Sequence, residues 1–282
     1  MATNFSNTSY TLGYEKALTM YQSFTANTDL TMVGYMMIGK CVIWGSPDDP
    51  VAIHDTEYSR FQTYNDFLGG KRITGNDVYL VLPRRDWSSG KVYTAYDDYS
   101  NTQFTSTNGM YVYVSTGEVY KCIYNANNAP STDVPAGDYT TNNGFKKMSD
   151  GYTWKYMYKV PADSKFLTSA WIPVPTIQTS AYFGHANNLV DGAISRMVVL
   201  TAGSGYGNNN TIITITGSGI TGNANAIVNA AGSLISANVD ARGVRYSRQN
   251  FKATVVGWGT GATVRTILSP YRGHGFNPAR EL

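Results

Sequence analysis

The sequence predicts a mainly β (α+β) protein with a central β-sandwich, short helices and a glycine-rich C-terminal β repeat. Its 28 glycines, 10 prolines and 13% aromatic residues are typical of short strands joined by tight turns. Several short runs alternate apolar and polar residues, which is the period of a strand. Late in the chain a block of sequence recurs after 40 residues, so that Gly243 repeats Gly203. These observations favour strands over helices as the main element.

The length allows one to three domains, and the sequence patterns change twice along the chain. We therefore expect three parts. They are an N-terminal α/β segment over 1–75, a β-sandwich domain over 76–180 and a C-terminal β repeat domain over 181–282.

Within the first part the sequence predicts a short helix around Gly13–Ser23, a buried strand over Met32–Trp44 and a longer helix over Asp55–Leu68. Asp55 is a favourable N-cap residue, and Gly69-Gly70 offers a C-terminal stop. Apolar side chains recur at helical spacing along the longer helix. We expect them to pack in the core or against another subunit.

The second part holds short strands separated by loops rich in Asn, Pro, Ser and Gly. The expected strands are Val78–Leu82, Lys91–Tyr96, Met110–Ser115, Val119–Tyr124 and Tyr152–Val160. The third and fourth are joined by the four residues 115–118, which is a good hairpin signal. Several short strands at this spacing favour a sandwich.

The stretch from Asp150 to Pro175 is the most regular part of the chain. Trp154, Tyr156 and Tyr158 occupy every second position, which places them on one face of a strand. Pro161 cannot donate a ladder hydrogen bond and so ends the strand. The prolines in residues 171–175 predict a stiff, extended exit. Because no nucleophile, base or metal cluster falls in this stretch, we interpret it as a structural part.

The block over 192–270 predicts an internal repeat. The same offset of 40 pairs Tyr206 with Tyr246, and we expect two strand–turn–strand copies that pack together to bury a shared face. Residues 217–222 match GxGxxG, a pattern typical of dinucleotide binding. However, weakly helical residues follow it, and the second copy at Gly257 breaks the pattern. We therefore interpret it as a glycine-rich turn used twice.

Several blocks occur in an order that resembles a known family. They are MMIGK at 36–40 with Trp44 and Asp48-Asp49-Pro50, KRI at 71–73 with PRRDW at 83–87, VYKC at 119–122, DGYTWKYMYK at 150–159 with KFLTSAWIPV at 165–174, and a weaker echo at Gly273-His274-Gly275. In this order they resemble the baseplate wedge proteins of contractile-tailed (myovirus-type) bacteriophages, the dimeric outer wedge subunit family. The match covers most of residues 30–175.

The resemblance implies a structural component of a tail baseplate wedge, which binds neighbouring wedge proteins during assembly and rearranges on sheath contraction. It implies a homodimer in the virion baseplate, assembled in the host cytoplasm, with other wedge proteins as partners and with no catalysis and no cofactor. Aromatic and arginine side chains are common anchors of such interfaces. The interface positions that we expect are Trp44, Arg84, Arg85, Trp87, His274 and Phe276.

Composition argues against several other classes. A net charge of +3 is too small to indicate a nucleic-acid surface. No apolar run reaches the roughly 18 residues of a membrane span, and the first residues do not resemble a signal peptide, so we expect no membrane insertion. Cys41 and Cys122 lie in apolar runs, where we expect buried free thiols.

The sequence offers little catalytic chemistry. His54, His185 and His274 lack metal-ligand spacing, and no GxSxG-type elbow supports a serine nucleophile. The adjacent carboxylates at Asp48-Asp49 and Asp97-Asp98 are expected in solvated loops. We therefore expect no metal site and no enzyme. Two alternatives stay open: a glycan- or receptor-binding tail module, and a glycan-cleaving enzyme.

Overall fold

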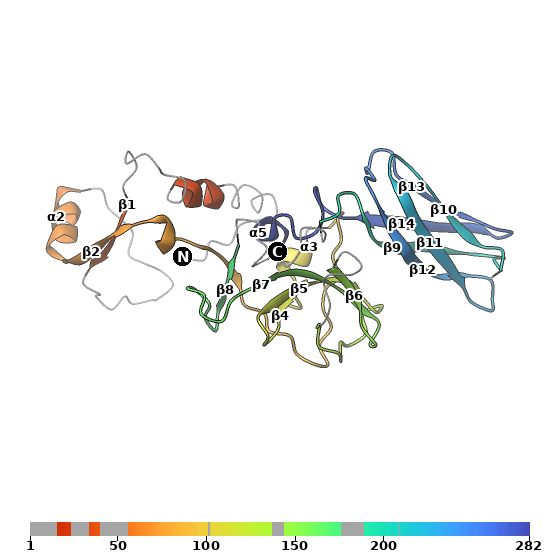
Figure 1. The fold of residues 1–282 in the computed structure, drawn as a ribbon, viewed down its shortest axis with the longest axis horizontal. Coiled ribbons are helices and arrows are strands. Elements are labelled where there is room, and N and C mark those ends of the chain that lie inside the picture. Colours follow the sequence, from red (N-terminus) through yellow and green to blue (C-terminus); the bar gives the residue numbers. More distant parts are fainter. Residues whose placement is uncertain are drawn as a thin grey trace. The chain divides into compact units, whose positions relative to one another are not determined.

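The computed structural model describes residues 16–23, 34–39, 56–100, 102–136, 144–175, 189–207 and 209–282. It is 45% strand and 11% helix, and its strands form several small antiparallel sheets (Figure 1), which confirms the prediction of a mainly β protein. The described ranges contain no closed barrel. The chain divides into two compact units, Met1–Leu80 and Val81–Leu282.

The first unit is the smaller of the two. It contains a helical segment over 16–23, strand β1 (Gly34–Gly39), helix α2 (Glu57–Asn65), strand β2 (Phe67–Ile73) and the 3-10 turn η1 (Gly75–Asp77). β1 and β2 pair to form an antiparallel two-stranded sheet. Thr74 and Asp77 form a capping box at η1, and Asp77 also pairs with Lys71.

Two predictions for this unit are wrong. The longer helix ends at Asn65, and Gly69 and Gly70 lie inside β2, opposite Ile38 and Met37 of β1. Pairing with β1 satisfies the backbone there, and so it overrides the local glycine stop signal. β1 is exposed along almost its whole length instead of buried. The predicted cap Asp55 and the rest of the predicted strand 32–44 lie outside the described residues.

The second unit begins with the central sheets. Its elements there are β3 (Leu80–Pro83), α3 (Thr102–Thr105), β4 (Tyr111–Tyr113), β5 (Glu118–Asn125), β6 (Phe145–Lys147), β7 (Tyr152–Lys159) and β8 (Trp171–Val174). Four strands form a sheet in the order β4-β5-β7-β6, and β3 pairs with β8. The β4–β5 hairpin and the strand-like exit at β8 match the predictions.

The predicted strand over Lys91–Tyr96 does not form. Lys91 forms a single β-bridge with Ser131. Other backbone N–H groups of the segment donate to carbonyls in different parts of the chain. Thr94 donates to Gly109 and Tyr96 donates to Cys122. The segment is thus held by tertiary contacts, which its alternating pattern could not distinguish from a ladder.

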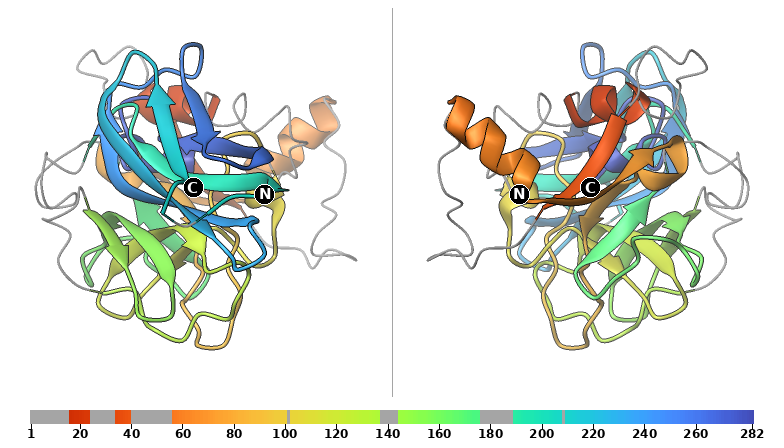
Figure 2. Two further views of the ribbon diagram at one scale, coloured as in Figure 1. Left: turned by 90° about the vertical axis from the view of Figure 1, so that its right-hand side faces the viewer. Right: turned by 90° about the vertical axis from the view of Figure 1, so that its left-hand side faces the viewer.

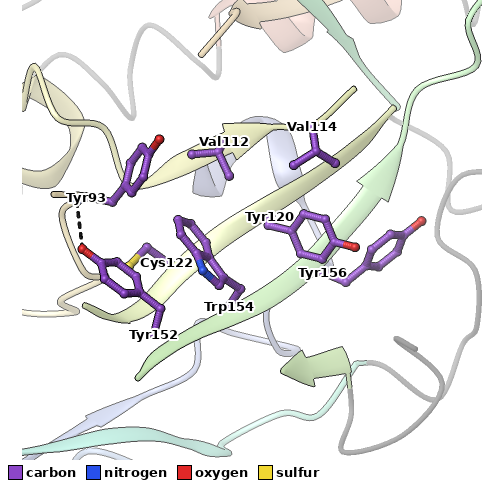
Figure 3. Packing of buried hydrophobic residues seen from close by; sticks show 8 residues of the cluster. All are labelled: Tyr93, Val112, Val114, Tyr120, Cys122, Tyr152, Trp154 and Tyr156. Carbon is purple, nitrogen blue, oxygen red and sulfur yellow. Dashed lines mark hydrogen bonds between the residues drawn. The ribbon is translucent and has the colours of Figure 1, made fainter. Parts of the chain in front are cut away.

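One face of the four-stranded sheet carries an aromatic core, and Figure 3 shows its side chains gathered over β4, β5 and β7. Trp154 stacks on Tyr152 with ring centroids 5.6 Å apart, and Tyr93 meets Trp154 edge-on at 5.4 Å. The main-chain N–H of Tyr93 donates to the Tyr152 hydroxyl at 3.3 Å (Figure 3). Burying each large side chain stabilises the fold by ~1.5–3 kcal/mol. The predicted aromatic face of this strand is confirmed for Trp154 and Tyr156, whereas Tyr158 lies beyond a register shift in the ladder with β5 and is buried outside this cluster.

The C-terminal elements form the predicted repeat with unusual regularity. The first copy consists of β9 (Ile194–Ser204), β10 (Ile212–Thr216) and β11 (Ile220–Val228), and the second of β12 (Leu234–Val244), β13 (Lys252–Val256) and β14 (Thr260–Leu268). Each strand of the second copy begins and ends 40 residues after its counterpart. The short helix α5 (Pro278–Glu281) follows.

The two copies exchange their outer strands. β11 of the first copy pairs with β12, and β14 of the second copy pairs with β9, while β10 and β13 pair around Thr214 and Thr254. Even the irregularities recur: the register shifts after Asn223 in one ladder and after Thr263 in the other. The repeat is therefore pseudo-symmetric, and its long ladders join one copy to the other. Figure 2 shows these strands beside the central sheet of the same unit.

The repeated glycines make room for two tyrosine rings. A side chain on Gly259 would overlap the ring of Tyr206, and one on Gly219 would overlap the ring of Tyr246. The Tyr246 hydroxyl accepts a hydrogen bond from the N–H of Gly222 at 3.0 Å, and the Tyr206 hydroxyl accepts the equivalent bond at 3.2 Å. The GxGxxG segment thus turns over residues 217–219 and enters the strand β11 at Ile220, as expected for a structural turn.

Candidate functional site

The first unit exposes a large amount of apolar surface. In α2, Tyr58, Phe61 and Tyr64 are 65–78% exposed. In the two-stranded sheet the exposed side chains are Tyr35, Met36, Met37, Ile38, Phe67 and Leu68. Patches of this kind are uncommon on monomeric soluble proteins and mark sites of contact with other molecules. We call these nine residues the apolar surface of the first unit.

This unit has no core of its own among its described residues. Every fully buried hydrophobic side chain that the structure describes lies at or beyond Tyr93. A two-stranded sheet with both faces exposed is marginally stable in water. The described part of this unit therefore has regular secondary structure without the burial that usually stabilises it. A partner that covered its apolar surface would supply that burial.

The predicted interface residues near β3 make contacts within the chain. Arg84 donates through Nε to Asp86 at 3.0 Å and lies 4.6 Å over the Tyr113 ring. Arg85 donates through Nη1 to the carbonyl of Ser106 at 3.2 Å. Trp87 packs against the aromatic core. These side chains hold the start of the second unit in place, and a further role in an interface stays a prediction.

The remaining predicted interface residues have different environments. His274 is 2% exposed and contributes to the interior of the chain instead of its surface. Phe276 is half-buried beneath the guanidinium of Arg272, at 4.8 Å. Trp44 lies outside the described residues.

His274 belongs to a buried polar cluster on the face of the central sheet opposite the aromatic core. Lys121 and Lys155 lie directly opposite each other on β5 and β7, and both are almost completely buried. Glu281 of α5 pairs with Lys121 at 3.3 Å. His274 lies with Nδ1 3.3 Å from the Lys121 amine and Nε2 2.8 Å from the hydroxyl of Ser195 on β9. The cluster thus joins the central sheet, the repeat and the last helix.

Burial controls the protonation of these groups. It lowers the pKa of Lys155 to about 7, with Glu281 opposing and Arg242 adding to the shift. Burial, with help from Lys121, lowers the pKa of His274 to about 3, so this imidazole is neutral at pH 7. The pKa of Glu281 is lowered by Lys121 and His274 in spite of its burial. The cluster thus places two buried amines near a single described carboxylate, Glu281.

Ser195, His274 and Glu281 have the composition of a hydrolytic triad, but their arrangement does not favour catalysis. Nδ1 of His274 lies between the Lys121 amine at 3.3 Å and the Glu281 carboxylate at 3.5 Å, so a cation competes for the position that the carboxylate alone occupies in a triad. Ser195 is 2% exposed, and a base works best with a pKa near the working pH. We therefore interpret the cluster as structural.

The adjacent carboxylates Asp97 and Asp98 correct a sequence-based prediction, because they are not solvated. Asp97 forms a two-point ion pair with Arg265, at 2.9 and 2.5 Å. The Asp98 side chain is fully buried, pairs with Arg248 at 2.6 Å and accepts from the N–H of Leu268 at 3.1 Å. Both carboxylates thus fasten the central part to the repeat.

Sequence reasoning missed Lys121, Lys155 and Glu281 as members of one site. A signal was present, because each lysine interrupts an otherwise apolar strand, in VYKCIY and in WKYMY. A charged residue in a strand that is buried on both faces needs a partner. Nothing in the sequence indicated that the partner is Glu281.

The described residues contain no cluster of His, Cys, Asp and Glu that could hold a metal ion, and none of their helices is long and apolar enough to span a membrane. Cys122 is a buried free thiol, as predicted, whereas Cys41, His54 and His185 fall in the parts that the structure leaves undescribed. Comparison with protein-family models and with curated proteins gives no match.

Proposed function

We propose that this chain is a structural component of a phage tail baseplate wedge, which binds neighbouring wedge proteins during assembly and rearranges on sheath contraction. The observation that carries the proposal is the first unit, whose described residues form helix and strands without a core while exposing large apolar side chains. Burying such side chains on a partner stabilises a complex by up to ~1.5–3 kcal/mol each. The resemblance of residues 30–175 to the wedge family supplies the identity of the assembly.

The second unit supports the same role in another way. Its central sheet, repeat and last helix are fastened by ion pairs such as Asp97 with Arg265 and Lys121 with Glu281. Such ion pairs hold the elements of the second unit together, which suits a subunit that keeps its own fold while the baseplate rearranges. We further propose that residues 76–180 form a central β-sandwich and that the chain is a homodimer in each wedge of the virion baseplate.

Two measurements test the proposal. Quantitative mass spectrometry of purified virus particles is expected to give a fixed multiple of six copies, with twelve for a dimer in each wedge. Absence from particles would overturn it.

The second measurement is sedimentation of the purified full chain. We expect Phe61→Ser to weaken self-association or binding to wedge proteins, because Phe61 is 65% exposed on the apolar surface of the first unit. Tyr271→Ser is the matched control, since Tyr271 is 76% exposed in the second unit. Equal effects of the two substitutions would contradict the assignment of the apolar surface.

A further inference from the structure

The second unit contains a groove between the central sheet and the repeat. Its volume is about 600 Å³, and its walls come from β5, β6 and β7 on one side and from β9 and β12 on the other. Cavities that bind small molecules usually have volumes of roughly 300–1,000 Å³. The groove therefore has room for a ligand the size of one or two sugar rings.

The lining of the groove is basic. Lys147, Arg196 and Arg242 contribute three positive charges, and Asp240 is the one carboxylate among the described lining residues. Arg196 already contacts Asp97 at 3.8 Å and the carbonyl of Tyr96. An anionic ligand would thus meet a favourable potential from Lys147 and Arg242.

Arg242 is the charge best placed for an anion. Its Nη1 donates to the carbonyls of Ile194 and Ser195, and its guanidinium lies 3.7 Å over the ring of Phe145. It makes no ion pair with a described carboxylate, and burial alone lowers its pKa to about 10. Fixed from one side by two carbonyls and from another by a ring, it is a preorganised donor for a carboxylate or phosphate.

The repeat shows that the fold does not require an arginine at this position. The equivalent residue of the first copy is Ala202, which lies opposite Ala262 just as Arg242 lies opposite Gly222. The two copies share strand bounds and register, so alanine is compatible with this backbone. Of the two copies, only the second therefore carries a guanidinium at this position, where it lines the groove.

The other lining groups suit a hydroxylated ligand. Ser236, Asn238, Thr153 and Asn127 offer neutral hydroxyl and amide groups, and the half-buried Tyr124 offers a ring face with a polar end. Such groups complement sugar hydroxyls on one side and an apolar sugar face on the other. We propose that this groove binds an acidic saccharide, with the carboxylate or phosphate of the sugar on Arg242.

The test is a titration of the full chain, followed by calorimetry, with four probes: sodium glucuronate, glucose 6-phosphate, glucose and inorganic phosphate. We expect the two acidic sugars to bind and glucose to bind at least roughly tenfold more weakly, because it lacks the charge-assisted bond. The two acidic sugars distinguish a carboxylate from a phosphate as the preferred anion. If glucose binds as tightly as the two acidic sugars, the proposal is overturned. If inorganic phosphate binds as tightly as glucose 6-phosphate, the assignment to a sugar is overturned.

Substitutions locate the site. Arg242→Ala, which copies the first repeat, is expected to weaken binding of the acidic sugars roughly tenfold or more, and Arg242→Lys less. Lys252→Ala is the control, because Lys252 is an exposed cation of the same repeat that does not line the groove. Asn238→Glu adds a negative charge at an exposed lining position and provides a second variant if Arg242→Ala is unstable. Unchanged affinity in both groove variants would overturn the proposal, whatever the outcome of the particle and sedimentation measurements.

Discussion

Lys155 gives the fold an unusual pH dependence that can be measured directly. Its pKa is lowered from 10.5 to about 7 by burial, while Glu281 of α5 opposes the shift and Arg242 of β12 adds to it. Lys121 and His274 are the other ionisable groups of the cluster. Between pH 7 and 10.5 the unfolded chain binds a proton that the folded chain does not, so the free energy of unfolding rises with pH in this window.

The size of the effect follows from the two pKa values. At ~1.4 kcal/mol for each pH unit, the full window corresponds to about 5 kcal/mol, of which about 2 kcal/mol falls between pH 7 and pH 9. Most proteins have their maximum stability between about pH 5 and 8. Here we expect stability to keep rising to pH 9, where tyrosines are still protonated.

The assay is urea unfolding of the full chain at pH 7 and pH 9, followed by tryptophan fluorescence, to which the buried Trp154 contributes. Lys155→Met is expected to reduce the rise by about 2 kcal/mol, leaving the part due to the lowered pKa of the buried Lys121, and to stabilise the protein at pH 7, because an apolar side chain replaces a buried amine. Lys159→Met is the control, since Lys159 is a half-exposed lysine of the same strand. If the wild type and Lys155→Met show parallel changes between the two pH values, the reasoning is refuted.

Three further predictions concern stability and are measured by the same urea titration. Glu281→Gln leaves Lys121 without its counter-charge and should cost about 3–5 kcal/mol; a loss under about 1 kcal/mol would contradict the buried pair. Tyr206→Phe and Tyr246→Phe each remove one hydrogen bond to a backbone N–H and should cost about 1 kcal/mol apiece; clearly unequal losses would argue against the pseudo-symmetry. Gly219→Ala should cost about 1–3 kcal/mol because its methyl would overlap the Tyr246 ring, whereas Gly207→Ala, with open space around it in the same unit, serves as the control; equal losses would contradict this packing.

Periodicity and repetition allowed much of the second unit to be predicted. The alternation of Trp154, Tyr156 and Tyr158 placed a strand, of which Trp154 and Tyr156 share the aromatic face, and the offset of 40 residues placed both copies of the repeat. These patterns succeed because side-chain direction in a strand depends only on position along the chain. The same rule failed at Lys91–Tyr96, where an alternating segment is held by tertiary hydrogen bonds.

The sequence by itself determined the mainly β class, the repeat, the free thiol at Cys122 and the structural use of the glycine-rich turn. Only the tertiary structure decided that Lys121 and Lys155 are buried beside Glu281, that the outer strands of the repeat are exchanged, and that the described part of the first unit lacks a core. The physical reason is that burial, ion pairing and strand exchange depend on segments far apart in the chain. Lys121 and Glu281 are 160 residues apart, and no local pattern in the sequence records their contact.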